Sequence, residues 1–242
     1  SPDKRTGSTY TPPELAHFLA HAAIQAAQWP AHGPIRVLDP AVGDGSLLAA
    51  LLEAMPPSLW PRLEVTGLDI DPEALQASRR RLSRWPVRTL TLLQEDFLDS
   101  LTGQGAPSHS SVSAAHAGFD VVIANPPYVR TQVMGAQATR QLAQRFGLSG
   151  RVDLYYAFLL GISQVLAPAG VASVVTSNRF MTTQSGRNVR AALRLLERAD
   201  DIEAEKLGQE PARRLEVGAL DRAMRKKLIV HDGSYAGHGN LL

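Results

Sequence analysis

The stretch IRVLDPAVGDGSLLAALLEA, residues 35–54, decides the fold class of this 242-residue chain. It opens on a short β-type run, Ile35 to Leu38, that stops at Asp39 and Pro40. Two glycines follow, and a helical stretch begins at Ser46. A strand, a glycine turn and a helix in this order predict the first β-α unit of a parallel sheet.

Similar strand and helix patterns lie on both sides of this stretch. Helices are expected at 12–28, 46–55, 71–81, 153–166 and 185–198, and strands at 35–38, 63–68, 89–93, 119–124 and 171–176. Residues 102–118, which are rich in Ser, Gly and Ala, are expected to form a surface loop. This alternation predicts an α/β fold with a doubly wound parallel sheet.

The composition limits the classes of function. The chain has no cysteine, which excludes a disulfide scaffold, thiolate metal sites and a cysteine nucleophile. The net charge is only +2, yet residues 130–198 hold nine arginines and only two acids, Asp153 and Glu197. Such a basic region indicates either a polyanionic partner or a solvated face.

The uncharged run from Leu154 to Asn178 is long enough to cross a bilayer. However, Pro168-Ala169-Gly170 interrupts it, and the residues after this turn are β-branched. A buried helix-turn-strand unit is therefore predicted instead of a membrane span. With no visible signal peptide, we expect a cytoplasmic protein without a membrane partner.

Polar residues follow the apolar strands at their predicted carboxyl ends, where doubly wound sheets bind ligands. Asp39 precedes a G-x-G turn that lacks the third glycine of a dinucleotide fingerprint, so it favours a nucleoside carrying an amino acid, or else a generic tight turn. Asp69 could accept both ribose hydroxyls, or it could be a solvated carboxylate or helix cap, although Asp71 is better placed to cap.

Asn125-Pro126-Pro127-Tyr128 is the most informative tetrad. Two prolines after a buried strand fix the backbone and leave carbonyl acceptors beside one amide side chain and one ring. Such a site suits a planar amine: the Asn125 oxygen and the Pro126 carbonyl could accept its N–H groups, and Tyr128 could stack on its ring. A structural Pro-Pro turn is the alternative interpretation.

The ordered motifs of residues 6–198 resemble those of the gamma-class adenine-N6 DNA methyltransferases of restriction-modification systems. The segments that carry the resemblance are Thr9-Tyr10-Thr11-Pro12-Pro13, residues 39–45, Leu68-Asp69-Ile70-Asp71, Asp96-Phe97, Asn125-Pro126-Pro127-Tyr128, residues 153–156 and Ser177-Asn178-Arg179-Phe180. The family implies a Rossmann-like, class I S-adenosylmethionine-dependent domain that methylates an adenine flipped out of double-stranded DNA, with no metal.

The resemblance also implies a role for individual residues. The cofactor-binding set is Thr11 and Pro12 beside the methionine, Asp39, Pro40, Ala41, Gly43 and Gly45 at its amino acid end, Asp69 at the ribose, and Ile70, Asp96 and Phe97 around the adenine. The catalytic set is Asn125, Pro126, Pro127 and Tyr128, which would grip the target base.

The family pattern ends early. Members usually continue into a β-hairpin with a clamping aromatic residue and then a target-recognition domain, and neither is recognisable after Arg198. We therefore expect a catalytic domain at 1–199 and an atypical tail at 200–242, with a helix near 212–227 and a strand at 228–230. A truncated or frameshifted member, or one served by a specificity subunit, fits this pattern.

Other functions remain open at this point. A glutamine side-chain amide in a protein is also a conjugated nitrogen, so a protein glutamine-N5 methyltransferase could use the same tetrad. An RNA base methyltransferase and a non-catalytic remnant that binds the cofactor are further alternatives. Cytosine-C5 methylation is excluded, because it needs a cysteine.

Overall fold

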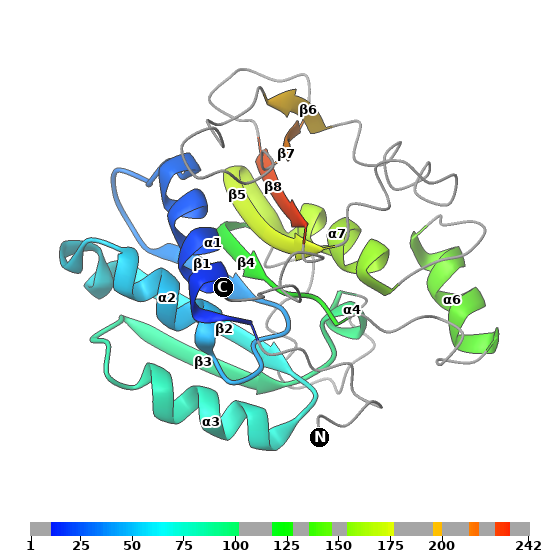
Figure 1. Cartoon of the computed structure of the whole chain (residues 1–242), viewed down its shortest axis with the longest axis horizontal. Helices are drawn as coiled ribbons and strands as arrows, with labels where there is room; N and C mark the ends of the chain where they lie inside the picture. The colour runs from blue at the N-terminus through cyan, green and yellow to red at the C-terminus, as the bar shows by residue number, and fades with distance from the viewer. Residues whose placement is uncertain are drawn as a thin grey trace, which may run out of the picture.

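An eight-stranded sheet organises the protein (Figure 1), seen in a computed structural model that describes residues 11–101, 118–127, 136–146, 154–176, 196–199, 213–217 and 226–232. In chain order its elements are α1 (Pro13–Ala26), β1 (Ile35–Asp39), α2 (Ser46–Ala54), a 3-10 helix (Pro57–Arg62), β2 (Leu63–Asp69), α3 (Pro72–Leu82), β3 (Thr89–Gln94), α4 (Phe97–Ser100), β4 (Phe119–Ala124), α6 (Ala136–Phe146), α7 (Leu154–Val165), β5 (Leu166–Thr176), β6 (Leu196–Ala199), β7 (Arg213–Val217) and β8 (Lys226–Asp232). The strand order is β3-β2-β1-β4-β5-β8-β7-β6. Strands β1 to β5 are mutually parallel, which confirms the predicted doubly wound sheet.

Helices cover both faces of this sheet, because successive residues of a strand point to opposite sides. On one side, Val37 and Val121 pack with α1, α2 and α3. On the other side, Leu38 and Val122 pack with α4, α6 and α7. Figure 1 shows these two helix layers on opposite sides of the strands. Burial on both faces explains why β1 and β4 are nearly continuous apolar runs.

The helices that follow β1 and β2 begin where the sequence predicts. Asp71 caps α3, since its side chain accepts a hydrogen bond from the Glu73 amide at 2.8 Å, and Pro72 occupies the first turn. Gly45 precedes α2 with a φ of +80°, a left-handed conformation that favours glycine. Both starts are local in origin, which is why the sequence pattern predicts them.

The uncharged run beginning at Leu154 forms the predicted helix and strand, but the strand starts earlier than expected. β5 begins at Leu166 instead of residue 171. Phe119 pairs with Leu166 and Val121 with Val171, so the register shifts and the predicted turn becomes a bulge inside the strand. Among the described residues, no helix combines the length and apolarity needed to cross a membrane.

The C-terminal part differs from the sequence prediction. The helix expected near 212–227 is wrong where the structure describes it, because 213–217 and 226–227 belong to β7 and β8. β8 is parallel to β5, and β7 runs antiparallel to β8 and β6. The strand expected at 228–230 is confirmed. The helix expected at 185–198 is wrong at 196–198, which lie in β6, and its remainder falls outside the described residues, as do 102–117.

Candidate functional site

Four of the predicted residues lie along the carboxyl edge of the sheet. Asp39 is the last residue of β1, and Asp69 is the last residue of β2. Asn125 directly follows β4, and Asp96 lies two residues beyond β3. Because β3, β2, β1 and β4 are consecutive in the sheet, the fold brings these residues to one edge.

The Asp39 side chain is fully buried and only partly hydrogen-bonded. Its Oδ1 accepts a hydrogen bond from the Ala41 amide at 3.0 Å, while Oδ2 has no hydrogen-bond partner in the described part of the chain. Burial raises the pKa of Asp39 to about 8, and the charges of Asp69 and Asp44 add to this rise. A buried carboxyl group with an unpaired oxygen suits a cationic partner such as an ammonium group.

The turn after Asp39 depends on its two glycines. Gly43 has a φ of +52° and Gly45 a φ of +80°, and Pro40 ahead of them is buried. A Cβ on Gly43 would meet nothing within 4 Å, whereas a Cβ on Gly45 would lie 2.9 Å from Ser78 Oγ. The turn therefore packs against α3 at Gly45 and has open space beside Gly43.

Asp69 links this turn to the start of α3. Its Oδ2 accepts a hydrogen bond from the Gly43 amide at 2.8 Å, and its Oδ1 accepts one from the Asp71 amide at 2.9 Å. Each carboxylate oxygen has a second lone pair, so both can still accept a ligand hydroxyl. The neighbouring Ile70 side chain is 56% exposed, unlike every other large hydrophobic side chain that the structure describes. An exposed aliphatic surface beside a carboxylate suits a base and ribose.

Asp96 and Phe97 are placed differently from each other. Asp96 is exposed and caps α4, because its Oδ1 accepts hydrogen bonds from the amides of Leu98 and Asp99 at 2.8 and 3.1 Å. Phe97 is 1% exposed, and its ring packs against Phe158 with the ring centroids 5.4 Å apart. Its ring is thus part of the core, and its expected contact with a cofactor stays a prediction.

The Asn125 side chain is held by a residue far away in the sequence. Its Nδ2 donates a hydrogen bond to Thr11 Oγ1 at 3.0 Å, and Thr11 is itself buried beside Pro12 at the start of α1. The Oδ1 atom of Asn125 is buried and has no hydrogen-bond partner among the described residues. With the nitrogen occupied, the oxygen is left to accept a hydrogen bond from a ligand N–H group.

The rest of the tetrad is described only in part. Pro126 is buried and Pro127 is half-buried directly after Asn125, while Tyr128 lies outside the described residues. The structure therefore brings Thr11, Asn125 and the two prolines together. The expected stacking by Tyr128 stays a prediction.

Three further residues at this edge escaped the sequence analysis. Ser78 and Arg81 of α3 bond to the turn at residues 43–44, and Thr176 ends β5 with a fully buried hydroxyl that has no hydrogen-bond partner in the described ranges. A polar residue ending an apolar strand is the signal that identified Asp39, and it would also have identified Thr176. Nothing local distinguishes Ser78 or Arg81 from other polar helix residues.

Comparisons with known proteins place the chain among methyltransferases. A family model described as Eco57I restriction-modification methylase matches residues 64–203. Type II methyltransferase M.BanIII of Aneurinibacillus aneurinilyticus is 38% identical over 210 residues, which are 85% of this chain and 36% of that protein. Release factor glutamine methyltransferase of Caulobacter vibrioides is 30% identical over 169 residues, which are 68% of this chain and 52% of that protein. The chain thus spans about a third to a half of the length of these relatives.

A solved structure shares the fold. It is a putative class I S-adenosylmethionine-dependent methyltransferase from Listeria monocytogenes, with a TM-score of 0.59 and 18% identity, covering 93% of this chain and 66% of the other. This likeness confirms the expected class I methyltransferase fold. The family match covers more than half of the chain and includes three residues at the carboxyl edge, Asp69, Asp96 and Asn125. On this match, and in keeping with the resemblance of its motifs, the chain belongs to the Eco57I restriction-modification methylase family.

Proposed function

We propose that this chain transfers a methyl group from S-adenosylmethionine to the exocyclic N6 of an adenine flipped out of double-stranded DNA, as the modification component of a restriction-modification system. The observation that carries the proposal is the pair of unpartnered buried oxygens, Asp39 Oδ2 and Asn125 Oδ1, at one edge of the sheet, where the described residues offer neither a hydrogen bond. One suits a ligand cation and the other a ligand N–H group.

The residues of β1, β2 and the turn between β1 and α2 fit this cofactor. Asp39 would pair with its ammonium group, Asp69 would accept its ribose hydroxyls, and Ile70 would pack on its adenine. The open space beside Gly43 leaves room for a ligand to approach the backbone. When bound, S-adenosylmethionine supplies a methyl group on a positively charged sulfur, which is an electrophile.

Asn125 acts on the nucleophile. The lone pair of an adenine amino group is delocalised into the ring, so this nitrogen attacks poorly. If Asn125 Oδ1 and the Pro126 carbonyl oxygen accept hydrogen bonds from its two N–H groups, the nitrogen becomes more electron-rich and more tetrahedral. Thr11 contributes by holding the amide nitrogen of Asn125, so that the oxygen faces the base. The surplus proton of the methylated nitrogen can leave to water, and no side-chain base is required.

We extend the proposal to the organisation of the chain. The catalytic domain comprises residues 1–199, and β7 and β8 extend its sheet beyond β5. Contacts with DNA bases other than the target adenine come from a target-recognition domain or from a separate specificity subunit. The protein acts in the cytoplasm, where its DNA substrate would be. The candidates for contacts with the DNA phosphates are the arginines from Arg130 onward in residues 130–198, with no single one assigned.

The test is transfer of a labelled methyl group to unmethylated bacterial DNA, with N6-methyladenine measured by mass spectrometry. We expect the wild-type chain to form N6-methyladenine and Asn125→Ala to lower the rate by about 10²- to 10³-fold, as for other groups that act on developing charge. Gln28→Ala, which removes a side-chain amide from an exposed position, serves as the matched control and retains the wild-type rate.

A protein substrate is the second candidate, because a release factor glutamine methyltransferase is 30% identical to this chain. The same assay, with a release factor added in place of DNA, separates the two. Labelled glutamine without labelled DNA would replace our proposal by the protein methyltransferase. Cofactor binding with no labelled product of either kind would identify a non-catalytic remnant.

A further inference from the structure

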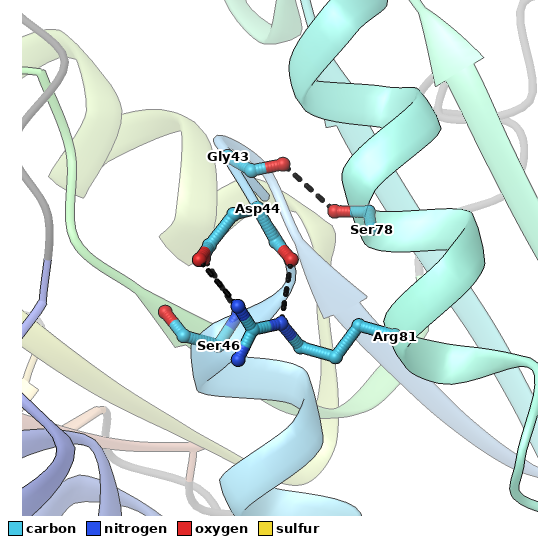
Figure 2. Close-up of polar contacts among 5 residues, drawn as sticks. All are labelled: Gly43, Asp44, Ser46, Ser78 and Arg81. Carbon is cyan, nitrogen blue, oxygen red and sulfur yellow. Dashed lines mark hydrogen bonds and ion pairs between the residues drawn. The ribbon is translucent and has the colours of Figure 1, made fainter.

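The turn at residues 43–45 is held from outside by one face of α3 (Figure 2). Ser78 Oγ donates a hydrogen bond to the Gly43 carbonyl at 2.7 Å. Arg81 Nε donates to the Asp44 carbonyl at 3.0 Å, and its Nη2 contacts Asp44 Oδ2 at 2.7 Å. Ser78 and Arg81 are three residues apart, so they lie on one helix face. We name these two residues the α3 clamp.

The clamp determines which way the peptide groups of the turn face. In a planar trans peptide, the N–H of one residue points opposite to the carbonyl of the residue before it, and no described peptide bond is cis. Because the Gly43 carbonyl is bonded to Ser78, the Asp44 N–H points away from α3. That N–H makes no hydrogen bond to any residue that the structure describes. It is left available to a ligand on the other side of the turn.

The clamp also couples two parts of the candidate cofactor site. The Gly43 amide donates to Asp69 Oδ2, and Asp69 accepts from the amide of Asp71, which caps α3. Helix α3 therefore starts beside the carboxylate of Asp69, the proposed ribose-binding residue. Farther along the same helix, Ser78 and Arg81 are hydrogen-bonded to the turn. Asp44 is held on both sides, since its Oδ1 accepts a hydrogen bond from the Ser46 amide at 3.0 Å (Figure 2).

We propose that Ser78 and Arg81 are positioning residues for the cofactor, which hold the Gly43–Gly45 turn so that its backbone faces the amino acid end of S-adenosylmethionine. The inference rests on the proposed function. Neither residue touches the ligand. Arg81 is half-exposed, and an exposed ion pair adds little to global stability, so its main effect is on the geometry of the turn.

The experiment uses two ligands that differ only at the amino acid end. S-adenosylhomocysteine carries that end, and 5′-methylthioadenosine lacks it. We expect Arg81→Ala to raise the dissociation constant for S-adenosylhomocysteine about tenfold, the effect of losing one charge-assisted contact. The dissociation constant for 5′-methylthioadenosine should rise much less, because the Asp71 amide also holds Asp69. Ser78→Ala should act in the same direction, and Arg81→Lys, which can restore the ion pair, should recover part of the affinity. Binding is measured by calorimetry.

Arg80→Ala is the matched control, because it removes the same charge from an exposed neighbour on α3 and should bind both ligands like the wild type. The melting temperature of each variant, measured without ligand, shows whether a loss of affinity comes from unfolding of the protein or from displacement of the Gly43–Gly45 turn. Equal affinity of Arg81→Ala and the wild type for S-adenosylhomocysteine would overturn the clamp, and so would an equal loss for both ligands. A wild-type chain that binds neither ligand would overturn the proposed function and the clamp with it.

Discussion

At the residue scale, Asp39 and Asn125 each have one oxygen that the described part of the chain leaves unpaired. A buried polar atom without a partner costs about 1–3 kcal/mol, so these two positions lower stability in the unliganded protein. In both residues the other polar atom is bonded, to Ala41 and to Thr11. Each side chain is thus oriented before a ligand arrives, which reduces the entropy lost on binding.

The raised pKa of Asp39 leads to a prediction on pH. Near neutral pH the unliganded carboxyl is mostly protonated, because its pKa is about 8, and an ammonium ligand must displace that proton. We expect the affinity for S-adenosylhomocysteine to rise with pH up to about 8, by up to about tenfold per pH unit, with release of one proton. Calorimetry in buffers of different ionisation enthalpy measures the released proton. Asp39→Asn should bind weakly and release none.

The same shift predicts how stability depends on pH. The folded pKa of Asp39 lies above the unfolded value of 3.8, so its contribution to stability is fully present below that value and is lost as pH rises toward 8. Without ligand, the melting temperature of Asp39→Asn should therefore rise relative to that of the wild type as pH increases. A constant difference across this range would contradict the assigned burial of a neutral carboxyl.

At the element scale, the turn between β1 and α2 is constrained by the position of Gly45. Gly45 combines a left-handed φ with close packing, since a Cβ there would lie 2.9 Å from Ser78 Oγ and 3.1 Å from Ser78 Cα. Gly33 has nearly the same φ, +82°, but its Cβ would meet nothing within 4 Å. An alanine at Gly33 would therefore introduce backbone strain alone, whereas an alanine at Gly45 would introduce both backbone strain and steric overlap with α3.

Alanine substitution at these two positions gives a stability prediction. Gly33→Ala should lower the free energy of unfolding by about 1–2 kcal/mol, the cost of a left-handed alanine. Gly45→Ala should lower it by about 1–3 kcal/mol more, because α3 must also move. Urea unfolding measures both changes. Equal losses in the two variants would show that α3 does not press on the turn as the structure indicates.

At the scale of the whole molecule, positive charge is concentrated in residues 130–198. Within this region, the structure describes Arg140 as exposed on α6 and Arg145 as paired with Asp99 at 3.3 Å. If these arginines and their neighbours bind phosphates, each contact releases counterions from DNA. Binding should then depend strongly on salt.

We expect the dissociation constant for a duplex to rise about 10³-fold or more between about 50 and 200 mM salt if six or more phosphates are contacted. Fluorescence anisotropy with a labelled duplex measures this slope, and S-adenosylhomocysteine binding at the same salt concentrations is the control. The charge-reversing substitution Arg140→Glu should make the dissociation constant depend less steeply on salt concentration. Salt-independent DNA binding would remove residues 130–198 from the proposed interface.

The amino-acid sequence by itself determined strands β1 to β5, apart from the early start of β5 at Leu166. It also determined the helix starts at Ser46 and Pro72 and the strand-end positions of Asp39, Asp69 and Asn125. These depend on local signals: apolar runs, glycines with left-handed φ, and capping side chains. Sequence predicted β7 as helix, because its charged pattern fits either element and only pairing with β6 and β8 makes it a strand.

Only the tertiary structure decided which polar atoms of the site are hydrogen-bonded within the chain and which are left to bind a ligand. The Thr11–Asn125 bond joins residues 114 positions apart, and the Ser78–Gly43 bond joins residues 35 apart. No local pattern encodes such pairs, because they arise when packing on the sheet brings distant elements together. For the same reason, the core position of the Phe97 ring against Phe158 follows from the packing of α4 on α7, and the motif around it does not reveal it.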